Sequence, residues 1–292
     1  MASPSVSPAP LLRVGVHTSV AGGVETAAQR AHELGATALQ IFSSSPRQWR
    51  AAAIPATSCD AMRRLRAAYN LGPLVIHDNY LINLAAAKPD VHAKSMAAFR
   101  GELERAVALG AEYLVMHPGS STGGDHGEAK QRFVESVRRC AEGLDWGSLT
   151  LLIENTAGGG SHLGGTFEEV AELIDGLAGL PVGACIDTCH TWVAGYDLVT
   201  PAGYEATLQQ LDATVGLSRV HVFHVNDAKA GLGSRLDRHE HIGKGQLGDA
   251  VFARLLRDPR CQGKAFIAET PVDEEGDERR NLDRLRALAE GE

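Results

Sequence analysis

The chain has few aromatic residues and no long apolar segment. Phe, Tyr and Trp together make up 5% of its 292 residues, so a large core must be built mainly from aliphatic side chains. No apolar stretch reaches the roughly 20 residues that a membrane-spanning helix needs. The opening MASPSVSPAP has neither a basic start nor an apolar core, so we do not expect a secretory signal. These absences favour a cytoplasmic globular protein in which residues 1–10 are a disordered tail.

Paired cysteines and an excess of basic residues are lacking as well. The five cysteines form no CxxC pair, which favours reduced, buried thiols over a disulfide framework. The formal net charge of −8 argues against a general nucleic-acid coat protein. That objection weakens if several of the acidic residues hold metal ions, because bound cations invert the local sign of the field.

Short apolar runs recur along the whole chain, and each is followed by a turn and a helical pattern. The runs cover residues 13–19, 36–45, 74–78, 113–119, 150–156, 183–190, 220–227 and 265–271. The helical patterns cover roughly residues 22–35, 58–70, 90–110, 127–144, 167–178, 203–214, 248–257 and 277–289. Eight such units without a break in composition predict a parallel sheet that closes into a (β/α)8 TIM barrel. We therefore expect one α/β barrel domain over residues 11–292, with the active site at the C-terminal ends of the strands.

Side chains of the types that bind metals stand at the ends of seven of these eight runs. They are His17, His77, His117, Glu154, Asp187 with His190 close behind, His224 and Glu269. Only the run at residues 36–45 lacks such a residue. The C-terminal ends of barrel strands face one common mouth, so the repetition predicts a converging metal site.

Two further segments complete the candidate set. In the run VHVFHVN, alternation puts Val222 and His224 on one face, so His224 points inward if Val222 fills the barrel. In the next loop, Asp237 and His239 are two residues apart and can reach one ion, and His241 is spaced to compete with His239. The resulting imidazoles and carboxylates outnumber the ligands of a single four-coordinate zinc. Their mixture favours a cluster of zinc or manganese ions with bridging carboxylates over magnesium or calcium.

The order and the residues of the sequence motifs resemble those of the endonuclease IV family of metal-dependent apurinic/apyrimidinic endonucleases. The matching stretches are GVHTSVAGG, FSSSPRQW, HDNYLINLA, MHPGS, IENTAGGGS, IDTCHTWVAGYDL, FHVNDAKAGLGSRLDRHEHIGKG and IAETP, which lie between residues 15 and 271. IDTCH, HDNYLINLA and the loop from NDAK to DRHEHIGKG are in combination specific for this family, whereas MHPG alone would be weak evidence for it. The resemblance implies a DNA repair enzyme that hydrolyses the phosphodiester 5′ to abasic sites in duplex DNA. The implied products are a 3′-hydroxyl and a 5′-deoxyribose phosphate.

The resemblance also implies three Zn²⁺ ions, one of which could be replaced by Mn²⁺. The implied ligands are His77, His117 and Glu154 for the first ion, Glu154, Asp187, His224 and Glu269 for the second, and His190, Asp237 and His239 for the third. Glu154 would bridge two ions, and Glu154 and Glu269 would also orient the nucleophile. Three divalent ions outweigh four ligand carboxylates, and the positive charge that remains suits a phosphodiester.

DNA contacts are implied in the same way. Arg47 and Gln48 in PRQW, with Tyr80 and Leu81 in HDNYL, would fill the gap left when a baseless nucleotide is flipped out of the duplex. The competing interpretation is a solvated arginine and ordinary packing at the rim. Backbone amides of Gly119, Ser120, Gly243 and Gly245, together with Lys244, could hold phosphates. Turn geometry would explain these glycines equally well.

The chain departs from the family pattern at two places. Some members have a Lys-Asn pair before the PRQW-like segment, where this chain has Ser43–Ser45. The resemblance therefore does not imply the DNA contact of that pair for this chain. After IENTAG, a polar residue often precedes the second glycine, whereas this chain has Gly159 and Gly160. No ligand position departs from the pattern.

Two alternative functions stand beside the endonuclease. Sugar isomerases and epimerases of the xylose isomerase-like barrels share the fold and several metal ligands. They have no evident use for His190, Asp237 and His239, or for the PRQW and HDNYL loops. A catalytically silent binder of damaged DNA would be expected to lose a ligand or the bridging Glu154, and this chain keeps all of them. We therefore expect a monomeric zinc-dependent phosphodiesterase that acts on duplex DNA and has no membrane partner.

Overall fold

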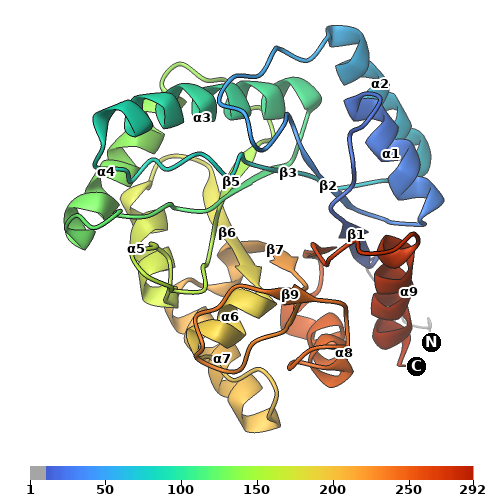
Figure 1. The fold of residues 1–292 in the computed structure, drawn as a ribbon. Helices are drawn as coiled ribbons and strands as arrows, with labels where there is room; N and C mark the ends of the chain where they lie inside the picture. The colour runs from blue at the N-terminus through green and yellow to red at the C-terminus, as the bar shows by residue number, and fades with distance from the viewer. Residues whose placement is uncertain (1–10, 292) are drawn as a thin grey trace, which may run out of the picture.

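The computed structural model describes residues 11–291, which form a ring of parallel strands surrounded by helices (Figure 1). The strands of the ring are β1 (Arg13–Val16), β2 (Leu39–Phe42), β3 (Leu74–His77), β4 (Tyr113–Met116), β5 (Thr150–Glu154), β6 (Val182–Asp187), β7 (Val220–His224) and β10 (Ala265–Ala268). They pair in the order β1-β10-β7-β6-β5-β4-β3-β2, and all pairs are parallel. Between β1 and β2 the ring is joined by a bridge between His17 and Gln40 and by a 2.7 Å hydrogen bond from the Thr18 amide to the Gln40 carbonyl. The predicted (β/α)8 barrel is confirmed, and the predicted tail at residues 1–10 lies outside the described residues.

Helices alternate with the strands along the chain. They are α1 (Val24–Glu33), α2 (Ala56–Tyr69), α3 (Pro89–Leu109), α4 (His126–Ala141), α5 (Phe167–Gly176), α6 (Thr188–Ala194), α7 (Pro201–Thr214), α8 (Asp249–Arg257) and α9 (Asp277–Glu290), with short 3-10 helices η1 (Leu217–Arg219) and η2 (Pro259–Cys261). All the α-helices but α6 begin and end within three residues of the ranges that the sequence predicts, and the two 3-10 helices have no predicted counterpart. Within residues 11–291, no helix is both long and apolar enough to cross a lipid bilayer.

The sequence explains where helix α5 begins. Thr166 and Glu169 have the spacing of a capping box, and Thr166 caps α5 by accepting a hydrogen bond from the Glu169 amide at 3.2 Å. The Glu169 carboxylate accepts from the Gly165 amide instead of closing the box on Thr166.

The short hairpin of β8 (Asp227–Ala228) and β9 (His239–Glu240) was not predicted, and its second strand carries the candidate ligand His239.

The apolar core has an outer and an inner part. The outer part fills the space between the helices and the sheet. The inner part fills the barrel with the buried side chains of Ala38, Val75, Val115, Leu152, Cys185, Val222, Ala265 and Ile267. The inner filling forms the floor beneath the residues at the C-terminal ends of the strands.

Candidate metal centre

Seven strands each place a polar side chain two residues after an apolar residue of the barrel interior. These successive pairs are Ala38 and Gln40, Val75 and His77, Val115 and His117, Leu152 and Glu154, Cys185 and Asp187, Val222 and His224, and Ile267 and Glu269. Side chains two positions apart on a strand share a face, so the polar residues converge above the apolar floor. The run at residues 36–45 therefore also contributes to the mouth, through Gln40, although it contains no residue of the metal-ligand type.

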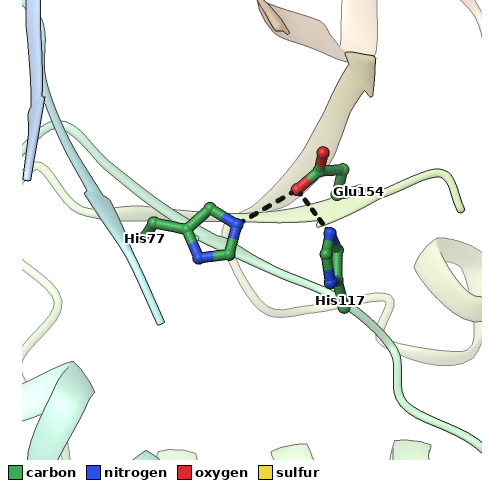
Figure 2. A group of neighbouring side chains, drawn as sticks. All are labelled: His77, His117 and Glu154. Atoms are coloured by element: carbon green, nitrogen blue, oxygen red, sulfur yellow. Dashed lines mark ion pairs between the residues drawn. The ribbon is translucent and has the colours of Figure 1, made fainter. Parts of the chain in front are cut away.

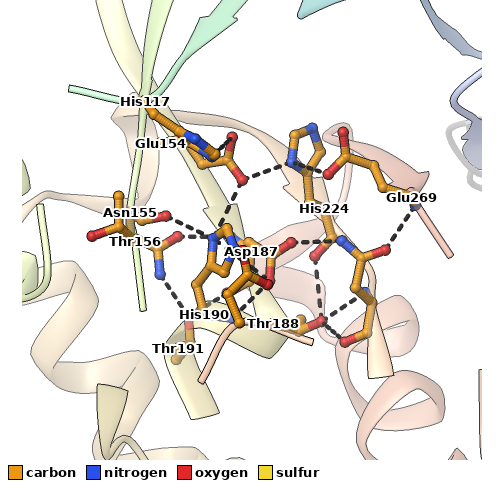
Figure 3. A network of polar contacts seen from close by, with 12 residues as sticks. His117, Glu154, Asn155, Thr156, Asp187, Thr188, His190, Thr191, His224 and Glu269 are labelled. Atoms are coloured by element: carbon orange, nitrogen blue, oxygen red, sulfur yellow. Dashed lines mark hydrogen bonds and ion pairs between the residues drawn. The ribbon is translucent and has the colours of Figure 1, made fainter. Parts of the chain in front are cut away.

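Glu154 lies at the centre of this convergence (Figures 2 and 3). Its Oε2 is 3.3 Å from Nε2 of His77 and 3.1 Å from Nε2 of His117, and its Oε1 is 2.9 Å from Nδ1 of His224. The carboxylate is fully buried, and Oε2 makes no hydrogen bond. A buried carboxylate that faces several imidazoles and has an unsatisfied oxygen has the donor chemistry of a bridging metal ligand.

Two groups of side chains meet at Glu154. Ligand atoms of His77, His117 and Glu154 all lie within 4.8 Å of one another. The same holds for ligand atoms of Glu154, Asp187, His224 and Glu269. These two groups coincide with the ligand sets that the resemblance implies for the first and second ions.

The residues expected for a third ion lie next to the second group. Asp237 joins them, with Oδ2 at 3.2 Å from Nε2 of His190 and Oδ1 at 3.3 Å from Nε2 of His239. Nε2 of His239 is buried, makes no hydrogen bond and is 3.7 Å from Oδ2 of Asp187. The short helix α6 brings His190 to this place, because Asp187 caps α6 by accepting a 2.7 Å hydrogen bond from the His190 amide.

Three of the histidines are held through Nδ1 by the backbone. Nδ1 of His77, His190 and His239 each lies 2.9 to 3.1 Å from a backbone carbonyl oxygen. Such a bond fixes the tautomer and leaves a lone pair on Nε2, which is how metal-binding histidines are usually oriented. The donor chemistry, the fixed tautomers and the two unsatisfied ligand atoms all fit divalent zinc.

The electrostatics of the cluster favour positive charge at its centre. Burial lowers the pKa of His77, but Glu154 and Glu269 raise it more, to about 10. Burial also lowers the pKa of His239, and neighbouring acidic residues raise it to about 9. Burial raises the pKa of Glu269, and the histidines around it hold that pKa far below the ordinary range. Several buried carboxylates in one place therefore require cationic partners, which a group of metal ions would supply.

Some titratable residues near the mouth do not belong to the ligand groups. The expectation that His241 competes with His239 is wrong, because Nδ1 of His241 lies 3.0 Å from Nδ2 of Asn281, outside the cluster. The thiols of Cys185 and Cys189 do lie within 4.8 Å of candidate ligands, which the sequence did not suggest. Burial raises the pKa of both thiols well above the usual range, which disfavours the thiolate form.

The side chains expected to enter DNA lie on loops around the mouth. Arg47 and Gln48 are exposed after β2, and Leu81 is half-buried after β3. Tyr80 is 63% exposed, and its ring centre is 5.1 Å from that of Phe42 and 5.8 Å from that of His77. The loop after β3 therefore places an exposed aromatic ring beside a candidate metal ligand.

The backbone amides expected to hold phosphates are only partly available. The amide of Ser120 donates to Oδ1 of Asn83 at 3.1 Å, and the amide of Gly245 donates to Oδ2 of Asp227 at 3.0 Å. A donor engaged in this way is not free for a phosphate. The expectation is therefore corrected for the amides of these two residues.

Turn geometry accounts for the other two glycines of this group. Gly119 has a φ of 88° and Gly243 a φ of 75°, a region in which a residue with a Cβ is strained. The side chain of Lys244, between Gly243 and Gly245, is exposed. Of this group, Lys244 therefore offers the clearest contact for a phosphate.

A buried cluster of imidazoles and carboxylates at the mouth of a (β/α)8 barrel defines a metal-dependent barrel enzyme. Residues 28–288 match the family described as xylose isomerase-like TIM barrel. A probable endonuclease 4 from Solibacter usitatus is 51% identical over 281 residues, which cover 95% of this chain and 97% of that protein. One from Chloroflexus aurantiacus is 43% identical and covers 96% of this chain and 99% of that protein. The chain belongs to the endonuclease IV family.

Solved structures agree with this assignment. The crystal structure of endonuclease IV from Thermus thermophilus has a TM-score of 0.85 to this chain at 42% identity, covering 96% of this chain and 100% of that one. A D-tagatose 3-epimerase-like protein has a TM-score of 0.71 at 20% identity, covering 96% and 97% of the two chains. At that identity the likeness concerns the fold alone, so the sugar isomerase alternative receives less support than the nuclease.

Proposed function

We propose that this protein is a DNA repair endonuclease that hydrolyses the phosphodiester 5′ to abasic sites in duplex DNA. The products would be a 3′-hydroxyl and a 5′-deoxyribose phosphate. The observation that carries the proposal is the meeting of three ligand groups at one barrel mouth, with Glu154 shared between two of them. Similarity to proteins named endonuclease 4 over nearly the whole chain supports the same conclusion.

We further propose that the cluster holds three zinc ions. The ligands would be His77, His117 and Glu154 for one ion, Glu154, Asp187, His224 and Glu269 for another, and His190, Asp237 and His239 for the third. Zinc bound there supplies Lewis-acid activation of water and stabilises charge on the phosphate. Mixed nitrogen and oxygen donors would also accept Mn²⁺ at one position.

The two catalytic carboxylates differ in their access to solvent. The Glu154 side chain is sealed beneath the mouth, whereas that of Glu269 is 15% exposed. Glu154 would hold two ligand groups together from below. Glu269 faces the open side, where its carboxylate can accept a hydrogen bond from the attacking water and orient it toward phosphorus.

Recognition would use the loops of the rim. Arg47, Gln48, Tyr80 and Leu81 would fill the space left by the flipped nucleotide. The 5.8 Å between the ring centres of Tyr80 and His77 means that a side chain in that space borders the first ligand group. Phosphate contacts would come from the side chain of Lys244, as the charged group, and from the backbone at Gly119 and Gly243.

We also propose that the protein acts as a monomer in the cytoplasm. All five cysteines are buried and unpaired. Free thiols are usual in a reducing compartment. The whole candidate site is built from one chain, so a second copy is not needed to complete it.

One experiment tests the activity and the metal centre together. Protein purified without added metal is incubated, without magnesium, with a duplex that carries one abasic site, and the same sample is analysed for zinc. We expect incision on the 5′ side of the lesion, little cutting of intact duplex and close to three zinc ions per chain. An uncut abasic duplex together with ketose–aldose interconversion would establish the sugar isomerase instead. Active protein with one zinc ion or fewer would overturn the trinuclear centre alone.

A further inference from the structure

Gln40 occupies a position that the other converging strands give to a proposed metal ligand. It follows Ala38 by two residues on the inner face of the barrel, as His77 follows Val75. The side chain of Gln40 is completely buried. A neutral carboxamide is not among the usual ligands of zinc, so this residue must serve the cluster in another way.

Both ends of the Gln40 carboxamide are bound to residues of the mouth. Its Oε1 lies 2.8 Å from Nε2 of His224. Its Nε2 donates to Oε1 of Glu269 at 2.5 Å and lies 3.0 Å from Nδ1 of His17. The opposite orientation of the amide would point its oxygen at the Glu269 carboxylate, and two acceptors would repel each other. The carboxylate therefore fixes which end of Gln40 meets His224.

This orientation determines the tautomer of His224. A carboxamide oxygen only accepts hydrogen bonds, so Nε2 of His224 must carry the proton. The lone pair is then on Nδ1, which lies 2.9 Å from Oε1 of Glu154 and 3.1 Å from Oε2 of Glu269. In His77, His190 and His239 the opposite nitrogen faces the cluster, and a backbone carbonyl fixes the tautomer. For His224 a side chain from β2 performs that task.

We propose that Gln40 is a positioning residue of the second ligand group, fixing His224 as the Nε2–H tautomer and holding Glu269 in place. The proposal rests on the proposed zinc centre. Residues that orient metal ligands commonly contribute about 10–100-fold to metal affinity or activity. Gln40 should therefore affect the affinity for one ion while leaving the number of ligands unchanged.

The direct test observes the tautomer. In protein loaded with zinc and labelled with ¹⁵N-histidine, two-bond ¹⁵N–¹H NMR correlations distinguish a proton on Nε2 from a proton on Nδ1. We expect His224 to carry its proton on Nε2 and to differ in this from the histidines held by backbone carbonyls. A His224 that carries its proton on Nδ1 in the unmodified protein would overturn the proposal without any substitution.

Two substitutions test the consequence for metal binding. Gln40→Met has similar length but removes both hydrogen bonds. Gln40→Glu keeps an acceptor for His224 but loses the donor and places a second negative charge against Glu269. Titration with a competing chelator should show one of three zinc ions bound about 10–100-fold more weakly in both variants. The matched control is Gln210→Glu on the outer helix α7. Gln210 donates to the carboxylate of Glu168 on α5 at 3.0 Å, so this variant makes the same change beside a carboxylate outside the site.

The outcomes separate this proposal from the proposed function. If both Gln40 variants hold zinc as tightly as the unmodified protein, Gln40 does not position the centre. If the variants lose affinity for one ion while the unmodified protein fails to cut abasic DNA, the positioning role stands and the endonuclease assignment fails. Metal affinity and the tautomer are both measured without a DNA substrate.

Discussion

The proposed metal ligands and the proposed DNA-contacting side chains differ most in what holds them in place. His77, Glu154 and His224 are buried, and each lies within 3.3 Å of another member of the cluster. Arg47 and Tyr80 are exposed, and within residues 11–291 their side chains form no ion pair or hydrogen bond. The first group is fixed before any substrate arrives, whereas the second is free to reorder when DNA binds.

The difference has a physical reason. Charged ligands buried in a low dielectric are stable only with partners at fixed positions, so the cluster must be organised by the folded barrel. A side chain that fills a gap in DNA has its partner only in the complex, because the gap exists only after the nucleotide is flipped. Changes to the buried group should therefore abolish chemistry, and changes to the exposed group should weaken recognition by smaller factors.

The largest effect is expected for Glu154→Gln. The substitution keeps the shape of the side chain but removes the charge shared by two ligand groups. Incision of abasic duplex should fall by several orders of magnitude, because ion spacing and formation of the nucleophile both depend on this carboxylate. Single-turnover incision rates and zinc content measure the effect. Circular dichroism should show an intact fold, since the apolar core lies beneath and around the mouth.

The matched control for this change is Glu172→Gln. It removes the same charge from an exposed carboxylate on α5, which pairs with Lys130 on the outside of the barrel. The control should cut abasic DNA at the unmodified rate. Near-normal incision by Glu154→Gln would show that Glu154 is not a bridging ligand. The proposed ligands would then not be more sensitive to substitution than the exposed side chains of the rim.

A smaller effect is expected for Arg47→Ala and Tyr80→Ala. Stacking contacts with bases contribute about 1–3 kcal/mol each, so tenfold or larger losses of affinity for abasic duplex are expected. Intact duplex should be bound nearly as before, because only the flipped complex opens the gap. Zinc content should not change. The two affinities must be compared at one salt concentration, because phosphate contacts make both depend on salt.

Arg64→Ala provides the control for loss of charge. Arg64 is exposed on the outer helix α2, so its removal changes the net charge by the same amount as the removal of Arg47. If Arg47→Ala and Tyr80→Ala discriminate abasic from intact duplex as well as Arg64→Ala does, both side chains belong to ordinary rim packing. The loops of the rim would then have no specific part in recognising the abasic site.

The same contrast explains how much could be predicted from the sequence. Strand alternation and the common mouth of a barrel predict that His77, Glu154 and His224 converge, and the structure brings them together. Gln40 was not predicted as a site residue, because a carboxamide is not a usual metal ligand. Its signal was its place in the run at residues 36–45, at the spacing that puts other residues on the inner face.

Other parts of the site depend on contacts that no local pattern contains. Helix α6 was missed because it follows β6 directly, with Asp187 serving both as the last strand residue and as the cap. The backbone amides of Ser120 and Gly245 were expected to bind phosphates. In the structure they donate hydrogen bonds to side chains 37 and 18 residues away along the chain. Hydrogen bonds of this kind are settled only when the chain is folded.

Asn79 connects the two loops of the rim, and its replacement should have the smallest effect. Its Nδ2 donates to the backbone carbonyls of Ser45 and Gln48, and its Oδ1 accepts from the Leu81 amide at 2.8 Å. The side chain is 3% exposed. Asn79 therefore holds the loop after β2, which carries Arg47, against the loop after β3.

Asn79→Asp keeps the size of the side chain and the acceptor for Leu81 but loses the donor to the other loop. A hydrogen bond contributes about 0.5–1.5 kcal/mol, so affinity for abasic duplex should fall about two- to tenfold. Zinc content and incision at saturating DNA should stay the same. If Asn79 acts through the loop that carries Arg47, Asn79→Asp should cost less affinity in the Arg47→Ala background than in the unmodified protein. Fully additive losses in this double-mutant cycle would mean that Asn79 supports the fold of the rim and does not position Arg47.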